Sequence, residues 1–262
     1  MSKYNFVEFN KIQKKFIKDG YVIFDVKNKD KLNLFKTKIQ SELKSSVVDF
    51  KNLNNIHKFT KKNLLNELRL KVLKKINQDL SMQKNYFEIG RDVLEDIVGN
   101  EMAMQNEISL SIQLPRDDSS LLNLHADTWS GNSPYEVVLW IPLVDVYETK
   151  SMFLLDVNEI KNFNRYFKKN NDLKSVYKKF KKKFKFLNLN YGQALIFNQN
   201  IPHGNMVNLT KETRWSMNCR FKSLFSPYRY KKFAEVFRPI STKPATITAI
   251  KYIYPRKVNE NF

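Results

Sequence analysis

Two segments of this 262-residue chain alternate strictly between apolar and polar side chains, and this alternation constrains the fold more than any other feature. Their apolar positions are Ile108, Leu110, Ile112 and Leu114 in residues 107–114, and Trp215, Met217, Cys219 and Phe221 in residues 214–222. Side chains two apart point to the same face of a strand, so each segment is predicted to be a strand with one apolar face. The polar faces could meet water, which is the usual arrangement, or line the lumen of a barrel whose apolar faces pack on helices.

Helical periodicity dominates the first hundred residues. Leucine and isoleucine recur at three- and four-residue spacing in residues 30–44 and 61–98, which predicts amphipathic helices. Gly20 is suited to a left-handed C-cap on a helix that begins near residue 5. Runs of β-branched, aromatic or continuous apolar residues predict further strands at residues 21–26, 137–141, 152–155, 191–197 and 246–254.

The chain has no repeat, no low-complexity linker and no clear domain boundary. We therefore expect one domain over residues 1–262, mainly β with flanking helices: residues 1–100 form a mostly helical cover, and residues 107–225 form the β core. Residues 159–185 interrupt that core with aromatic residues at helical spacing and many lysines, which predicts a basic helical insertion. A solvated helix with an aromatic seam is the favoured interpretation; a nucleic-acid or membrane face is the alternative.

The composition indicates a globular protein of the reducing cytosol. Hydrophobic residues form 42% of the chain, enough for a full core, and no run of eighteen apolar residues predicts a membrane span. Cys219 is the only cysteine, so no internal disulfide can form, and we expect a cytoplasmic location. The net charge of +20 favours anionic partners, although a nucleotide bias of the genome would also enrich lysine and asparagine in every segment.

Two of the three histidines suggest a metal site. In an extended segment His125 and Asp127 point to one face, and His203 follows a predicted strand 78 positions later. Two histidines and a carboxylate suit iron(II) with open coordination positions, although zinc or manganese could use the same ligands. Arg214 has a planar guanidinium and is followed two residues later by the Ser216 hydroxyl, a combination that suits the distal carboxylate of a keto-diacid. His57 lies in a lysine-rich segment and is expected to be structural.

The ensemble resembles the phytanoyl-CoA-hydroxylase-like branch of the iron(II)/2-oxoglutarate-dependent dioxygenases over most of the chain. Residues 16–22, Phe-Ile-Lys-Asp-Gly-Tyr-Val, are similar to that family's opening helix and strand. Trp140 stands where members of the branch often have tryptophan. Residues 192–197, followed by Ile-Pro-His-Gly at 201–204, resemble the approach to the distal histidine.

A narrower likeness concerns oxygenases of bacterial clusters that build or decorate surface carbohydrates. It covers residues 113–120 (Gln-Leu-Pro-Arg-Asp-Asp-Ser-Ser), 125–134 (His-Ala-Asp-Thr-Trp-Ser-Gly-Asn-Ser-Pro) and 137–145 (Val-Val-Leu-Trp-Ile-Pro-Leu-Val-Asp). This likeness implies a role in carbohydrate biosynthesis.

The resemblance implies a cupin-like jelly roll, the double-stranded β-helix, in which His125, Asp127 and His203 hold Fe(II). Arg214 and Ser216 would bind the C5 carboxylate of 2-oxoglutarate, with Gln113 as a further candidate, and O2 would be the other co-substrate. Related halogenases lack the carboxylate ligand, so Asp127 favours hydroxylation or another oxidation. The candidates on the substrate side are Trp129, Ser130 and Asn132, which could equally form a turn and its packing.

Three functions remain open. The first is an oxygenase that acts on a small or carrier-linked molecule, plausibly an anionic sugar or nucleotide-sugar. The second is an oxygenase that acts on a protein or, less favoured, a nucleic acid docked on residues 159–185. The third is a non-catalytic jelly-roll binding protein. Oligomeric state leaves no signal in the sequence.

Overall fold

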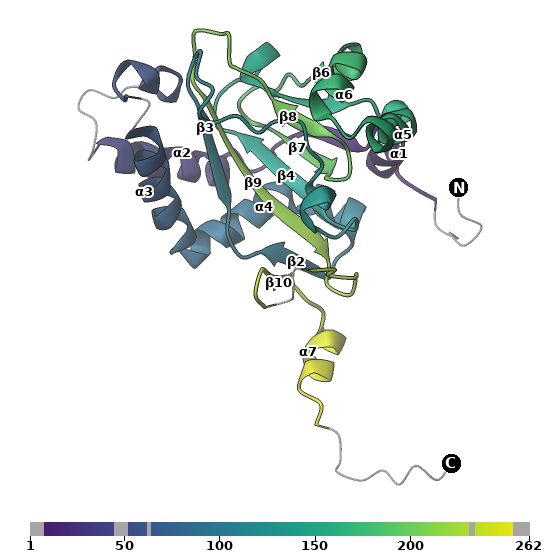
Figure 1. Ribbon diagram of the computed structural model, residues 1–262. Coiled ribbons are helices and arrows are strands. Elements are labelled where there is room, and N and C mark those ends of the chain that lie inside the picture. The colour runs from purple at the N-terminus through teal and green to yellow at the C-terminus, as the bar shows by residue number, and fades with distance from the viewer. Residues whose placement is uncertain (1–7, 45–51, 62–63, 231–233, 254–262) are drawn as a thin grey trace.

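Figure 1 shows two antiparallel sheets with helices packed around them, in a computed structural model that describes residues 8–44, 52–61, 64–230 and 234–253. The helices are α1 (Lys11–Asp19), α2 (Lys29–Lys44), α3 (Leu65–Asn77), α4 (Leu80–Val98), α5 (Ile160–Asn170), α6 (Leu173–Phe180) and α7 (Pro244–Ile250). The strands are β1 (Tyr21–Asp25), β2 (Met102–Gln105), β3 (Ser109–Gln113), β4 (Val137–Pro142), β5 (Met152–Leu155), β6 (Phe184–Phe186), β7 (Gln193–Asn198), β8 (His203–Asn205), β9 (Arg214–Ser223) and β10 (Phe237–Ser241). No helix in these ranges is long and apolar enough to cross a membrane.

The larger sheet has the strand order β1-β7-β4-β9-β2-β10, and β3 also pairs with β9. The long strand β9 is central: its first half pairs with β3, where Gln113 lies opposite Arg214, and its end pairs with β2. The smaller sheet has the order β6-β5-β8. The larger sheet therefore extends beyond residues 107–225 on both sides, because β1 and β10 join its edges.

Helices α3 and α4 cover the apolar face of the larger sheet. Phe87 of α4 lies beside Phe221 of β9, with ring centroids 6.1 Å apart, and the Tyr86 hydroxyl donates to the carbonyl oxygen of Leu139 at 2.7 Å. The four apolar residues of β9, from Trp215 to Phe221, are fully buried. The opposite face of β9 lines a cavity, so the second arrangement considered for the alternating strands, with polar side chains in a lumen, is the one observed.

Most predicted elements are present, with three differences. The first helix, predicted to begin near residue 5, begins at Lys11, and residue 5 lies outside the described ranges. The helical pattern of residues 61–98 is divided at Asp79, whose side chain caps the N-terminus of α4 by accepting from Ser81 N. The strand predicted at residues 246–254 is wrong, because Pro244 begins a helix there and residue 254 lies outside the described ranges. Gly20 ends α1 with φ at 73°, as predicted for a left-handed cap.

The basic insertion is helical and packs on the smaller sheet. Phe163 of α5 and Phe180 of α6 are buried together, with ring centroids 5.3 Å apart. Phe153 of β5 contacts Tyr177 of α6 and Phe184 of β6. The lysines face outward and are exposed, so the aromatic seam predicted from the spacing holds this helical pair to the fold.

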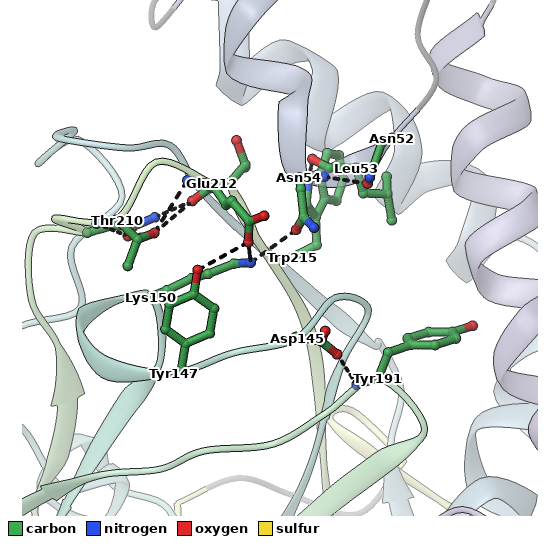
Figure 2. Close-up of polar contacts among 12 residues, drawn as sticks. Asn52, Leu53, Asn54, Asp145, Tyr147, Lys150, Tyr191, Thr210, Glu212 and Trp215 are labelled. Atoms are coloured by element: carbon green, nitrogen blue, oxygen red, sulfur yellow. Dashed lines mark hydrogen bonds and ion pairs between the residues drawn. The ribbon is translucent and has the colours of Figure 1, made fainter.

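A polar cluster fixes the start of β9, and Figure 2 shows it. The Nζ of Lys150, a fully buried residue, lies 2.6 Å from Glu212 Oε2 and donates to Asn54 Oδ1 at 3.1 Å. The indole of Trp215 donates to the carbonyl oxygen of Leu53 at 2.9 Å. These contacts anchor the residues on both sides of Arg214 to a segment about 160 positions earlier.

Candidate metal centre

The structure brings His125, Asp127 and His203 together between the two sheets. One ligand atom of each residue lies within 4.8 Å of the others. His125 and His203 are paired as in a β-ladder: His125 N donates to His203 O at 2.9 Å, and His203 N donates to His125 O at 2.7 Å. Residues 78 positions apart therefore present their imidazoles side by side, with ring centroids 4.3 Å apart.

Asp127 reaches the cluster from a turn and not from a strand. His125 and Ala126 are extended, but Asp127 begins the short 3-10 helix η3 (Asp127–Ser130). Its backbone is held by two bonds, from Asp127 N to the Gln199 carbonyl oxygen at 3.1 Å and from the Asn132 amide to the Asp127 carbonyl oxygen at 2.8 Å. The expectation of an extended His-X-Asp segment therefore holds only up to Ala126, although the side chains still converge.

The imidazoles are oriented for ligation through Nε2. Each Nδ1 lies 2.7 Å from a backbone carbonyl oxygen, that of Asn123 for His125 and that of Ile201 for His203. Such a bond fixes the tautomer in which Nε2 has a free lone pair. Burial lowers the pKa of His203 to about 4, so this ring is neutral at neutral pH, as a metal ligand must be.

Asp127 is ionised, and its two carboxylate oxygens have different neighbours. Burial alone would raise its pKa, but His125 and Arg220 together hold the pKa of this carboxyl well below its usual range. Oδ1 lies 3.6 Å from His125 Nε2, whereas Oδ2 lies 2.9 Å from Arg220 Nη2. For His125, burial would lower the pKa, but the hydrogen bonds to Asp127 and Asn123 raise it. Two imidazoles and one carboxylate form a mixed nitrogen and oxygen donor set that suits iron(II).

Arg214 is a buried cation with unsatisfied hydrogen-bonding capacity. It is 3% exposed, and within the described part of the chain its guanidinium donates one hydrogen bond, from Nη2 to Ser111 Oγ at 2.9 Å. Its Nε and the Ser216 hydroxyl are both buried and have no hydrogen-bond partner among the described residues. Burial lowers the pKa of Arg214 to about 10, which leaves it charged at neutral pH. A buried guanidinium with a hydroxyl beside it forms a site that suits a carboxylate.

A cavity of about 90 Å³ joins the three-residue cluster to Arg214. His125, Asp127 and His203 line it together with Arg214 and Ser216. Its apolar lining comes from Leu122, Val138, Trp140, Met152 and Phe197. The further polar lining comes from Ser111, Asn205, Asn218 and Arg220. The metal ligands and the candidate carboxylate-binding residues therefore share one chamber.

The other candidate residues lie outside this lining. Gln113 is the cross-strand neighbour of Arg214, but its amide nitrogen donates to the Met206 carbonyl oxygen at 2.5 Å. Trp129 stacks on Phe167 of α5, with ring centroids 5.2 Å apart, and Ser130 is exposed. Asn132 is buried and holds the backbone of Asp127. His57 is also outside the cluster, and its Nδ1 lies 2.9 Å from Thr213 Oγ1.

Sequence reasoning missed the role of two residues at this site. Arg220 contacts the Asp127 carboxylate, and Gln199 holds both Arg220 and the Asp127 backbone. The alternation of β9 places Arg220 on the same face as Arg214 and Ser216, so its position in the lumen could be predicted. Its choice of partner could not, because Asp127 is 93 positions away.

Comparison with known proteins supports the architecture. No protein-family model matches the sequence, and no curated protein matches it. Among solved structures, the non-heme monooxygenase ThoJ in a nickel complex aligns with a TM-score of 0.60 at 14% identity, over 89% of this chain and 84% of that one. The epimerase SnoN, in complex with Fe3+, alpha ketoglutarate and nogalamycin RO, aligns with a TM-score of 0.57 at 13% identity, over 84% of this chain and 85% of SnoN. HygX from Streptomyces hygroscopicus, with nickel and 2-oxoglutarate bound, aligns with a TM-score of 0.53 at 14% identity, over 84% of this chain and 90% of HygX.

These alignments show the fold. The chain is a jelly roll with flanking helices, as predicted from the sequence. ThoJ is a non-heme monooxygenase in complex with nickel, SnoN contains Fe3+ and alpha ketoglutarate, and HygX contains nickel and 2-oxoglutarate.

Proposed function

We propose that this protein is an iron(II)- and 2-oxoglutarate-dependent oxygenase that oxidises a small or carrier-linked molecule. The observation that carries the proposal is Arg214, a buried cation in the chamber that also contains His125, Asp127 and His203. Across the ranges that the structure describes, its Nε and the neighbouring Ser216 hydroxyl have no hydrogen-bond partner. A keto-diacid has one end that can chelate a metal and a distal carboxylate that fits Arg214. The solved structures of similar fold that bind nickel or iron with 2-oxoglutarate support the same assignment.

Each residue has a defined role in this proposal. His125, Asp127 and His203 would hold iron(II), which with 2-oxoglutarate and O2 supplies an oxidant for unactivated C–H bonds and releases succinate and carbon dioxide. Arg214 and Ser216 would bind the C5 carboxylate and so orient the keto acid. Leu122, Val138, Trp140, Met152 and Phe197 provide apolar walls that limit the access of water. The protein contributes binding, orientation and shielding.

The substrate is proposed to be anionic, plausibly a sugar or nucleotide-sugar in surface-carbohydrate biosynthesis. The net charge of +20 favours such a substrate, and Asn205, Asn218 and Arg220 provide polar groups in the chamber. The comparisons show small-molecule ligands in similar structures, hygromycin B in HygX and nogalamycin RO in SnoN. Membership of the phytanoyl-CoA-hydroxylase-like branch, the carbohydrate role and the cytoplasmic location stay predictions.

An anaerobic titration tests the proposed function. The wild-type protein should bind iron(II), then bind 2-oxoglutarate with a metal-centred absorption band, and on admission of air it should form succinate even without a substrate. Asp127→Ala should abolish the band, because it removes the carboxylate ligand. Succinate formation would exclude a non-catalytic binding protein. A wild-type protein that binds neither iron(II) nor 2-oxoglutarate would contradict the proposal.

A second candidate function is an oxygenase whose substrate is carried by a polyanionic macromolecule. The observation that favours it is the concentration of charge in residues 159–185, which contain eleven of the 46 Lys and Arg residues but only two of the 26 acidic residues. A genome-wide bias would spread lysine evenly, and this segment is much richer in lysine than the rest. Arg165 and Lys169 of α5, Lys179 of α6 and the nearby Lys183 line one groove. Glu159, which pairs with Lys183 at 2.8 Å, also lines it.

Salt dependence separates the two candidates. A docked polyanion should bind with an affinity that falls steeply as salt increases, because counterions are released. Replacing the exposed Lys169, Lys178 and Lys182 by Gln should weaken that binding, whereas the same change at Lys74, Lys75 and Lys84 on α3 and α4 should not. Absent or salt-insensitive binding of a nucleic-acid or acidic-protein probe would leave the small-molecule function.

A further inference from the structure

Arg220 has an unusual position, because it contacts one oxygen of a candidate metal ligand and not the other. Its Nη2 lies 2.9 Å from Asp127 Oδ2, and its Nε donates to the same oxygen at 3.2 Å. Asp127 Oδ1 instead lies 3.6 Å from the Nε2 of His125. The carboxylate therefore has one oxygen that faces the imidazole and one that is occupied by a guanidinium.

Other side chains hold the guanidinium in this place. Nε also donates to Gln199 Oε1 at 3.2 Å, and Nη1 donates to Gln105 Oε1 at 2.9 Å. Gln199 is fixed in turn, because its amide nitrogen donates to the Ser133 carbonyl oxygen and to the Oε2 of Glu136, a buried carboxylate, at 3.0 Å. Gln105 of β2 and Gln199, which precedes β8, thus fix the orientation of the Arg220 guanidinium.

We propose that Arg220 is a positioning residue that makes Asp127 a one-oxygen ligand. This inference rests on the proposed function. Iron(II) held by His125, Asp127 and His203 through one atom each would have three of six positions left for the keto acid and O2. A carboxylate that bound through both oxygens would take one of those three positions. By retaining Oδ2, Arg220 leaves only Oδ1 to the metal and keeps the third position open.

An ion pair with a purely structural role would behave differently. If Arg220 only neutralised a buried carboxylate, its loss would lower stability but leave the coordination of a bound metal unchanged. If it positions the carboxylate, its loss should also change the metal's affinity and its coordination. Removal of such supporting partners typically weakens metal binding by about 10- to 100-fold.

The test is a cobalt(II) titration, followed by 2-oxoglutarate, under nitrogen. In Arg220→Ala we expect cobalt(II) binding that is about 10- to 100-fold weaker, a changed d–d absorption spectrum, and 2-oxoglutarate that no longer perturbs that spectrum as in the wild type. Arg220→Lys can reach Oδ2 but cannot bond Gln105 and Gln199 as well, so it should recover part of the affinity and the wild-type spectrum. Wild-type affinity and spectrum in Arg220→Ala would overturn the inference.

Two controls keep the outcomes distinct. Arg238→Ala, on β10, should bind cobalt(II) as the wild type does, since Arg238 is not part of the chamber lining and donates to the Asn106 carbonyl oxygen at 3.3 Å. If Arg220→Ala does not fold, as judged by thermal unfolding, Gln105→Leu decides, because it removes the acceptor of the bond that Arg220 Nη1 donates. Wild-type cobalt(II) affinity and spectrum in Gln105→Leu would then overturn the inference. If the wild-type protein itself fails to bind cobalt(II), the proposed function fails, and the inference fails with it.

Discussion

Gly204 lies so close to the carbonyl oxygen of Leu122 that a Cβ atom at position 204 would be 2.8 Å from it. The same atom would be 3.0 Å from the Phe153 ring and 3.1 Å from the carbonyl carbon of Asn123. The contact continues at the next residue, where Asn205 N donates to Leu122 O at 2.9 Å. His203 directly precedes Gly204, and His125 lies two positions after Asn123. The absence of a Cβ at Gly204 therefore lets the two segments that carry the candidate histidine ligands approach each other closely.

Gly204→Ala should therefore weaken metal binding. The added methyl group meets backbone on one side, so the segment that leads to His125 must move away from β8 and separate the two imidazoles. We expect a loss in cobalt(II) or nickel(II) affinity of at least about 10-fold, measured by calorimetric titration. Affinity equal to that of the wild type would show that the two segments can separate without disturbing the cluster.

Gly90→Ala is the matched control for this change. A Cβ at position 90 would lie 2.8 Å from the Leu139 side chain, on the helical side of the larger sheet. This substitution adds the same methyl group in an equally crowded place, so it should lower the melting temperature. It should leave metal affinity unchanged, because Gly90 is not part of the chamber lining.

Arg214→Ala should weaken 2-oxoglutarate binding without loss of the metal. Truncation of one partner of a buried, hydrogen-bonded charge pair typically costs about 2–5 kcal/mol. The bound keto acid would then have a distal carboxylate without its guanidinium partner. Anaerobic titration of the iron(II)-loaded protein measures this change. A 2-oxoglutarate affinity within about twofold of the wild type would reject the role of Arg214.

The candidate ligands could be found from sequence because local chemistry marks them. Two histidines, one with a carboxylate two positions away, and an Arg-X-Ser at the start of an alternating strand are visible without knowledge of the fold. The polar face of β9 likewise predicts which side chains enter the lumen. What brings His125 to His203 is a backbone pairing across 78 positions, and this pairing has no local signal.

Other features depend on distant partners and could not be predicted. β10 contains Pro239 and lacks alternation, so it becomes a strand only because its edge pairs with β2. Residues 246–253 have β-branched composition, yet Pro244 at the first helical position begins α7. Lys150 would be placed on the surface by composition, but Asn54, 96 positions earlier, and Glu212 accept its ammonium in a fully buried place.

Lys150→Met should destabilise the fold, since it leaves Asn54 and Glu212 without their shared donor. We expect a loss of about 1–3 kcal/mol in the free energy of unfolding, measured in urea. Lys185→Met is the control, because Lys185 forms an exposed ion pair with Asp156 at 3.0 Å and such pairs contribute little. Equal effects of the two substitutions would show that burial of Lys150 adds nothing to stability.

The lowered pKa of Lys222 predicts how the free energy of unfolding changes with pH in the alkaline range. Its ammonium is buried, donates to the Pro227 carbonyl oxygen at 2.6 Å and lies 3.4 Å from the centroid of the Tyr228 ring. Burial lowers the pKa of Lys222 from 10.5 to about 8. Between these two values the unfolded chain binds a proton at this lysine that the folded protein does not bind, so the free energy of unfolding should rise with pH.

Lys222→Met isolates this contribution, because the other groups that titrate in the same range remain in both proteins. Urea unfolding of the two proteins should give a difference that is constant below about pH 8. Above that pH the wild type should gain stability relative to Lys222→Met, as the lysine loses its charge in the folded state and the desolvation penalty disappears. Parallel stability curves from about pH 7 to about pH 10 would mean that Lys222 stays charged where it is buried.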